Sequence, residues 1–289
     1  MLAVLLACAS AALFGAMAVA IRFALRRTDD PVLGALATST VALAVTLAIG
    51  IVSSVGDSLH ASDLWPFLLA GVIAPGLSQV LFTHAVRDAG AARTAVLMGT
   101  APLASVAIAL IVLGEPLQVP LVIGAALIVV GGVALAGERV RPEDFKRLGM
   151  LFALAATVMF AIRDNLLRWL VGETDTQALV TAPVTLLAGS GTVALYLAVT
   201  RGRAWARGYG VVVRAFFPAG VLFGLSYAAL FEAYYRGRVT VVAPLVATES
   251  LWGVIFAALL LRRSELVGRR LVAGAALIVA GGALIGAWR

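Results

Sequence analysis

Three charged residues interrupt stretches of the chain that are otherwise almost entirely apolar. Glu249 lies near the middle of the apolar run 239–261, and Arg163 and Asp164 lie in the second half of the run 148–170. If these runs span a membrane, each ionisable side chain costs at least about 2.5–3.5 kcal/mol at the bilayer centre, so such residues mark a functional site by default. We therefore predict that Glu249 binds a cationic group of a substrate or a coupling proton. The alternative is a structural ion pair with an arginine on a neighbouring helix.

Arg163 and Asp164 offer groups of both signs. Neighbouring residues on a helix point about 100° apart, so Arg163, Asp164 and Asn165 are expected to share the interior side of their helix. An arginine can hold a carboxylate or a phosphate by two parallel hydrogen bonds, and an aspartate can bind an ammonium group. The alternative is an ion pair, within the helix or between helices, that closes a gate while the arginine extends towards the interface.

The second half of the chain repeats the first. The sequence Gly-Ala-Ala-Leu-Ile-Val-Val-Gly-Gly at 124–132 returns at 274–282 with eight of nine residues identical. Gly-Leu-Ser at 76–78 returns at 224–226, and the offset between equivalent residues drifts only from 146 to 150. Duplication of this kind in an apolar chain is typical of a transporter that is built from two structural repeats.

Composition excludes a soluble globular domain. Hydrophobic residues make up 62% of the chain and the mean hydropathy is +1.04, whereas soluble domains are about 45–50% apolar. The apolar runs are continuous and roughly 20 residues long, which predicts membrane-spanning helices and not the alternating strands of a barrel. The ten predicted helices are 2–24, 32–54, 64–86, 93–113, 117–137, 148–170, 177–200, 212–234, 239–261 and 269–288.

Basic residues are distributed unevenly over the predicted loops. The loops after the first, third, fifth, seventh and ninth helices hold seventeen lysines and arginines, and the other loops with the C-terminus hold four. Because basic residues favour the cytoplasmic side, both termini are predicted to lie outside. Five helices per repeat is an odd number, so the two repeats are predicted to be inverted, with a pseudo-two-fold axis in the membrane plane. The predicted units are a first repeat 1–137, a cytoplasmic linker 138–147 and a second repeat 148–289.

Other chemistries find little support in the sequence. The net charge of +7 comes almost wholly from arginines at predicted helix ends, where they face lipid headgroups, so we expect no nucleic-acid partner. The single cysteine, Cys8, rules out a disulfide framework. There is no zinc-protease, phosphate-loop or Cys/His motif, so we predict no enzyme activity, no cofactor and no metal.

Two further residues suggest gates. His84 and Glu232 occupy equivalent positions in the two repeats, and inversion places them near the inner end of the third helix and the outer end of the eighth. Gates of an alternating-access protein would lie there, although a histidine near a helix end is more often an ordinary interfacial residue. Glu115 and Glu265 precede the fifth and tenth helices and are interpreted as structural caps of helix N-termini.

A central cavity at the interface of the repeats is the predicted binding site, because inverted repeats place substrate near the bilayer midplane. Aromatic and amide groups are expected there beside the charges, although an aromatic residue such as Trp252 is as easily explained by packing. The predicted lining residues are Phe14, Gln79, Met98, Arg163, Asp164, Tyr227, Glu249 and Trp252. Pro75, Pro102, Pro183 and Pro244 are predicted to interrupt helices, where a break can serve as a hinge or supply backbone polar groups.

Several short motifs recur in the same order in both halves. They are Pro102, Gly114-Glu115 and the glycines of 124–132 in the first half, and Glu249-Ser250, Ser264-Glu265 and the glycines of 274–282 in the second. In order and spacing these motifs resemble the EamA-like branch of the drug/metabolite transporter superfamily over the whole chain. Two positions depart from the family pattern: Ser250 replaces a proline, and Phe14-Gly15 replaces Trp-Gly.

The resemblance implies an all-α membrane protein with ten transmembrane helices in two inverted five-helix repeats. It also implies a multi-pass protein of a prokaryotic inner membrane, either monomer or homodimer, whose partners are the lipid bilayer, a small-molecule substrate and coupling protons. Because charges of both signs suit a zwitterion, we predict export of small polar metabolites, amino acids first. The alternatives are a multidrug or cation exporter, and a lipid flippase or small membrane-embedded enzyme.

Overall fold

The elements that the structure describes are all helices. This computed structural model describes residues 1–53, 64–104, 107, 119–136, 145–173, 177–237, 242, 245–261 and 267–287. The helices are α1 (Leu2–Thr28), α2 (Pro31–Ser53), α3 (Trp65–Gly71), the π-helical turn Val72–Leu77, α4 (Ser78–Ala89), α5 (Ala91–Met98), α7 (Val119–Ala136), α8 (Arg147–Glu173), α9 (Ala178–Arg201), the 3-10 turn Gly202–Ala206, α10 (Tyr209–Arg236), α12 (Glu249–Phe256), the π-helical turn Ala257–Leu261 and α13 (Arg269–Ala287).

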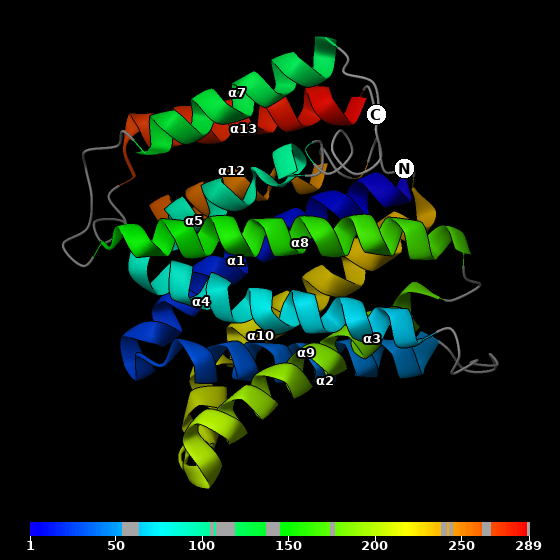
Figure 1. Cartoon of the computed structure of the whole chain (residues 1–289), viewed down its shortest axis with the longest axis vertical. Helices are drawn as coiled ribbons and strands as arrows, with labels where there is room; N and C mark the ends of the chain where they lie inside the picture. Colours follow the sequence, from blue (N-terminus) through cyan, green and yellow to red (C-terminus); the bar gives the residue numbers. More distant parts are fainter. Residues whose placement is uncertain are drawn as a thin grey trace.

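The long helices lie side by side and run roughly parallel or antiparallel to one another (Figure 1). The α7–α13 pair forms one edge of the molecule, α5 and α12 lie next to it, and α1 and α8 occupy the middle, with α2, α4, α9 and α10 beyond them. The helix α1 begins and α13 ends on the same side, as an even number of crossings requires. Which side of the membrane this is stays a prediction.

In the part of the chain that the structure describes, six helices are long and apolar enough to cross a membrane, which makes the protein a multi-pass membrane protein. Two predicted spans appear as shorter apolar helices, Val122–Leu135 and Glu249–Leu261. For the fourth and tenth predicted helices the structure describes α5, with 8 residues, and α13, with 19. Most of the fourth helix beyond Leu103 lies outside the described residues. The count of ten spans therefore stays a prediction.

Glycines bring α7 and α13 into close contact. A Cβ on Gly131 would lie 2.7 Å from the carbonyl oxygen of Gly274, and a Cβ on Gly124 would lie 2.8 Å from that of Gly281. Gly124 is the repeat equivalent of Gly274, and Gly131 is that of Gly281. Each of the two α7 glycines thus meets the repeat equivalent of the other. A two-fold axis between α7 and α13 produces this reciprocal pattern. Small residues of this kind let helix backbones approach closely in lipid.

The fourth and ninth predicted helices are each interrupted at equivalent positions. In the first half the amide N–H of Thr100 donates to the carbonyl of Leu97 (3.0 Å), and in the second half Thr248 donates to Leu245 (3.1 Å). These three-residue bonds form tight turns in place of α-helix. The two interruptions also touch, since a Cβ on Gly99 would lie 2.8 Å from the Cβ of Ser250.

Glu249 was predicted near the middle of the helix 239–261, and the structure places it directly after this interruption. Glu249 is the first residue of α12, directly after the turn at Thr248. The third predicted helix is also broken, at Ala74 before Pro75, where the backbone becomes extended (φ −144°, ψ 119°). Pro183, in contrast, does not interrupt α9, of which it is the sixth residue. Pro244 lies outside the described residues.

Two arginines that were assigned to headgroup-facing helix ends lie in the interior instead. Arg22 is 7% exposed and Arg93 only 1% exposed. The Arg22 guanidinium donates from Nη1 to the carbonyl oxygen of Arg87 (2.6 Å), and the guanidinium of Arg93 lies 5.7 Å from the centroid of the Phe145 ring. Both side chains find partners inside the protein, so their burial does not leave a charge without compensation.

Candidate functional site

Aromatic rings fill the middle of the bundle, where the two repeats meet. The ring of Phe14 on α1 lies 5.3 Å from Phe82, 5.9 Å from Phe160 and 6.3 Å from Phe223, between centroids. Phe14 and Phe160 are repeat equivalents, so their edge-to-face contact (89°) lies where a two-fold axis between α1 and α8 would pass. The partners of Phe14 lie one helical turn from Gln79, Arg163 and Tyr227 respectively, which places a polar layer next to the aromatic one.

Arg163 is the centre of the polar layer. Its side chain is buried, and its Nη1 donates to the hydroxyl of Tyr227 (2.5 Å). The guanidinium also lies 5.1 Å from the Phe160 ring centroid and 5.0 Å from that of Tyr227. A cation over aromatic faces is stabilised by the ring quadrupoles, more so away from water. Arg163 therefore keeps its charge in the interior.

Asp164 compensates part of this charge. Its Oδ1 lies 2.8 Å from Arg163 Nε, as an ion pair, although the angles are not those of a hydrogen bond. This confirms neither of the two roles predicted for Arg163 and Asp164, because an ion pair within one helix is compatible with ligand binding and with a gate.

The broken third helix supplies a backbone acceptor to the same site. The hydroxyl of Tyr227 lies 3.4 Å from the carbonyl oxygen of Ala74 and donates to it. In a regular helix the amide of Ser78 would bond this carbonyl, but here it donates to Ile73 and Pro75 instead. Sequence reasoning expected a break at Pro75 but missed Ala74 as the group that the break exposes, because the register of a broken helix cannot be derived from the proline alone.

Glu249 is 9% exposed and begins α12 beside this cluster. Among the described residues, Asp164 and Arg163 carry the charges near enough to act on its carboxylate. In the described part of the chain, no side chain forms a salt bridge with Glu249 within 4.0 Å, so the structural ion pair offered as its alternative role is not seen there. The turn at Thr248 places this carboxylate in the first turn of α12, where the helix dipole favours negative charge.

The other predicted lining residues lie around this group with different neighbours. Gln79 is fully buried, and both atoms of its amide have no hydrogen-bond partner among the described residues. The sulfur of Met98 accepts a bond from the hydroxyl of Thr157 (3.3 Å). Trp252 stacks on Phe256 of its own helix, with the centroids 5.7 Å apart. Gln79 thus has free hydrogen-bonding capacity, while Met98 and Trp252 are engaged in packing.

The two predicted gate residues have ordinary neighbours in this structure. The imidazole of His84 lies 5.3 Å from the Phe152 ring, between centroids, and the carboxylate of Glu232 forms an ion pair with Arg236 one turn along α10. Their gating role stays a prediction. Glu115 and Glu265, predicted as helix caps, lie outside the described residues.

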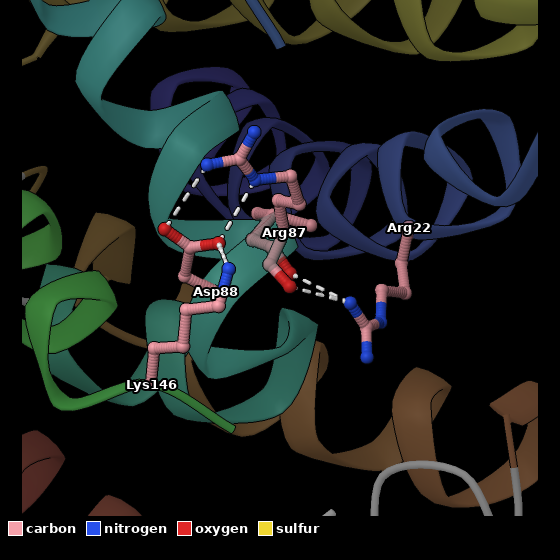
Figure 2. A network of polar contacts seen from close by, with 5 residues as sticks. Arg22, Arg87, Asp88 and Lys146 are labelled. Atoms are coloured by element: carbon pink, nitrogen blue, oxygen red, sulfur yellow. Dashed lines mark hydrogen bonds and ion pairs between the residues drawn. The ribbon is translucent and has the colours of Figure 1, made fainter. Parts of the chain in front are cut away.

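A second polar group joins α4 to its neighbours at the end of the bundle, and Figure 2 shows it. Asp88, at the end of α4, is 3% exposed and accepts hydrogen bonds from Arg87 Nε (2.8 Å) and Nη2 (3.3 Å). Lys146, just before α8, places its Nζ 3.7 Å from Asp88 Oδ1. Its backbone amide donates to the Asp88 carbonyl oxygen (2.7 Å). The sequence offered no signal for Asp88 beyond its place at the end of an apolar run.

No group of three or more histidine, cysteine, aspartate or glutamate side chains could hold a metal ion within the described ranges. The single cysteine, Cys8, is free. The polar site is therefore made of one guanidinium, two carboxylates, a phenol and an amide, groups that interact through charge and hydrogen bonds.

Comparison with known proteins identifies the family. The family model of the EamA-like transporter family matches residues 1–136 and again 147–287. Among curated proteins there is no match to the sequence. One solved structure, described only as the crystal structure of a protein, is similar in fold, with a TM-score of 0.63 and 22% sequence identity over 98% of this chain and 95% of that one. With two matched segments that together cover nearly the whole sequence, this chain belongs to the EamA-like transporter family.

Proposed function

We propose that the protein is a secondary transporter that exports small polar metabolites, amino acids first, by alternating access to a site between its two repeats. Its family is one of membrane transporters. The observation that supports the substrate class is the interior cluster of Arg163, Asp164 and Glu249, which holds charges of both signs away from water. A zwitterion presents both complementary charges to such a cluster.

The proposed roles of Arg163, Tyr227 and Glu249 follow from the contacts that these residues already make. Arg163 has five N–H donors, and the contacts to Tyr227 and Asp164 engage only Nη1 and Nε, so further donors can bind a substrate carboxylate. Tyr227 and the ring of Phe160 fix the guanidinium plane. Glu249, which no salt bridge holds among the described residues, supplies the partner for an ammonium group.

Alternating access is supported by the interrupted helices. Discontinuous helices at the interface of inverted repeats expose backbone groups to a central site and let one repeat rock against the other. The equivalent turns at Thr100 and Thr248 meet at this interface. Glu249 follows one of them, so a movement of α12 would change the surroundings of its carboxylate, as a coupling group requires.

The test is transport by the purified protein in liposomes, with a panel of labelled neutral, acidic and basic amino acids and an imposed pH gradient. Neutral amino acids should accumulate against their gradient. Glu249→Gln should abolish the accumulation that the pH gradient drives, while exchange of substrate without net movement continues. The control is Thr200→Ala, an exposed residue at the end of α9, which should transport normally. Accumulation by Glu249→Gln at the wild-type level would refute the coupling role.

A cation exporter is the second candidate, and one observation favours it. Arg163 is already engaged by Tyr227 and Asp164, so the site can act on a ligand mainly through Glu249 and the aromatic rings. Transport of tetraphenylphosphonium in the same liposomes, without transport of any amino acid, would support this candidate. Arg163→Ala separates the two, because it should weaken a zwitterion far more than a cation.

A further inference from the structure

One helix contact is built twice, at opposite ends of the bundle. At the start of α8, a Cβ on Gly149 would lie 2.6 Å from the backbone nitrogen of Ala89 at the end of α4. At the start of α1, the Cβ of Ala3 would lie 2.7 Å from a Cβ on Gly237 at the end of α10. Gly149 is the repeat equivalent of Ala3, and Ala89 is that of Gly237. The ends of α4 and α10 lie on opposite sides of the molecule (Figure 1).

The two contacts differ in chemistry. The contact at α4 carries the polar group of Figure 2, in which Asp88 accepts from Arg87 and pairs with Lys146, and Arg22 of α1 donates to the Arg87 carbonyl. The guanidinium of Arg93 on α5 adds its contact with Phe145. Charges thus tie α1, α4, α5 and the start of α8 together at one end.

The contact at α10 is apolar. Ala7 of α1 is buried there in a small cluster, the other members of which are Leu230, Ala233, Tyr234 and Val242. The equivalent of Asp88 is Arg236, and Arg236 pairs with Glu232 of its own helix instead of reaching across to α1. The same pair of helix ends is therefore fastened by charge in one repeat and by apolar packing in the other.

We propose that Asp88, with Arg87 and Lys146, is a latch that holds the α4–α8 end closed in the resting protein. We call these three residues the Asp88 latch. Separating α4 from α8 would take Lys146 away from the buried Asp88 carboxylate, which Arg87 of its own helix would then neutralise alone. The corresponding ends of α10 and α1 are held by apolar packing, and the hydrogen bonds between Ser10 and Ser226 lie further along these helices. Because of this difference, the α10–α1 end should open before the α4–α8 end when substrate is absent. The inference rests on the proposed alternating access.

The latch can be tested by thiol labelling without substrate. In a Cys8→Ser background, Thr94→Cys reports on opening at the latch end, because Thr94 is fully buried on α5. Ala7→Cys reports on the other end, where Ala7 is equally buried. Asp88→Asn should raise the labelling rate at position 94 by about tenfold, which corresponds to about 1.4 kcal/mol, because it removes the carboxylate charge that pairs with both Arg87 and Lys146.

The two reporters separate a latch from general loosening. Labelling at position 7 should stay the same or fall in Asp88→Asn, and Thr200→Ala, at the exposed end of α9, should change neither rate. Lys146→Gln should raise labelling at position 94 less than Asp88→Asn, because the Lys146 side chain is 65% exposed. An unchanged rate at position 94, or a rise at both positions, would overturn the latch. These rates require no transport, so a failed amino-acid assay would leave the latch result standing.

Discussion

Ser10 on α1 and Ser226 on α10 hydrogen-bond to each other reciprocally. Each hydroxyl donates to the other residue's carbonyl oxygen at 2.9 Å, and the two hydroxyls lie 3.1 Å apart. The equivalent residues in the other repeat are Ala156 and Ser78. The hydroxyl of Ser78 is buried and has no hydrogen-bond partner among the described residues. One repeat therefore has both serines of the pair, and the other repeat has only one of them.

Ala156→Ser should therefore stabilise the protein. Ala156 is fully buried on α8, and a serine there would give the Ser78 hydroxyl the partner that Ser226 has. A hydrogen bond of this kind contributes about 1 kcal/mol. Thermal unfolding in detergent should show a higher midpoint for Ala156→Ser and a lower one for Ser10→Ala. A lower midpoint for Ala156→Ser would mean that α4 and α8 leave no room for the hydroxyl.

Two adjacent glycines on α7 should respond oppositely to alanine. Gly131→Ala would place a Cβ 2.7 Å from the Gly274 carbonyl oxygen, so α7 and α13 must separate. Overpacking of this kind costs about 1–3 kcal/mol. A Cβ at Gly132 meets nothing within 4 Å, so Gly132→Ala should be neutral or stabilise by up to about 1 kcal/mol through helix propensity. Denaturation of both variants under one condition checks this, and equal losses would contradict the close α7–α13 contact.

Periodicity, duplication and composition were sufficient to predict much of the fold. The multi-pass membrane character and six of the helices follow from apolar runs of sufficient length, and the family follows from the order and spacing of the repeated motifs. The sequence did not show where the ninth predicted helix is interrupted. The turn before Glu249 depends on the packing of Gly99 against Ser250, residues 151 positions apart in the chain. Such contacts leave no local signal.

The candidate site was predicted in part for the same reason. Arg163 and Glu249 were identifiable because a charge in an apolar run is conspicuous. The carbonyl of Ala74 was not, since every residue carries one and only the broken helix frees it. The interior places of Arg22 and Arg93 were also missed. An arginine one or two turns from a helix end looks the same in sequence whether it points to lipid headgroups or caps another helix.

The ion pair between Asp30 and Arg201 should make stability depend on pH in the acidic range. Burial alone would raise the pKa of Asp30, but the hydrogen bonds from Arg201 and from the Leu33 amide hold it below its usual value. A lowered pKa means that the charged form stabilises the folded protein above the unfolded pKa of about 3.9, and that this stability is lost as the pH falls through the folded value.

Asp30→Asn should accordingly lower stability at neutral pH by about 0.5–1 kcal/mol, because the pair is partly exposed and screened. It should also flatten the fall in stability below about pH 4. Unfolding midpoints from pH 7 to pH 3 check both effects. Arg201→Gln is the matched variant, and it should lose a similar amount, because both changes remove the same ion pair and leave residue 30 an oxygen that accepts from the Leu33 amide. A wild-type pH profile in Asp30→Asn would assign the acid sensitivity to another carboxylate.

Tyr227→Phe tests whether the phenol positions Arg163. The change removes only the hydroxyl that accepts from Arg163 Nη1 and donates to the Ala74 carbonyl, while the ring under the guanidinium stays. Leaving these two buried groups with one partner fewer should cost about 1–3 kcal/mol of stability. If Arg163 binds the substrate carboxylate, KM for a neutral amino acid should rise several-fold while transport of a cation is little affected. Tyr235→Phe on the same helix, whose hydroxyl lies 3.3 Å from that of Thr181 away from the site, is the matched control. An equal loss for zwitterion and cation in Tyr227→Phe would mean that Arg163 holds α8 and α10 together and does not contact the ligand.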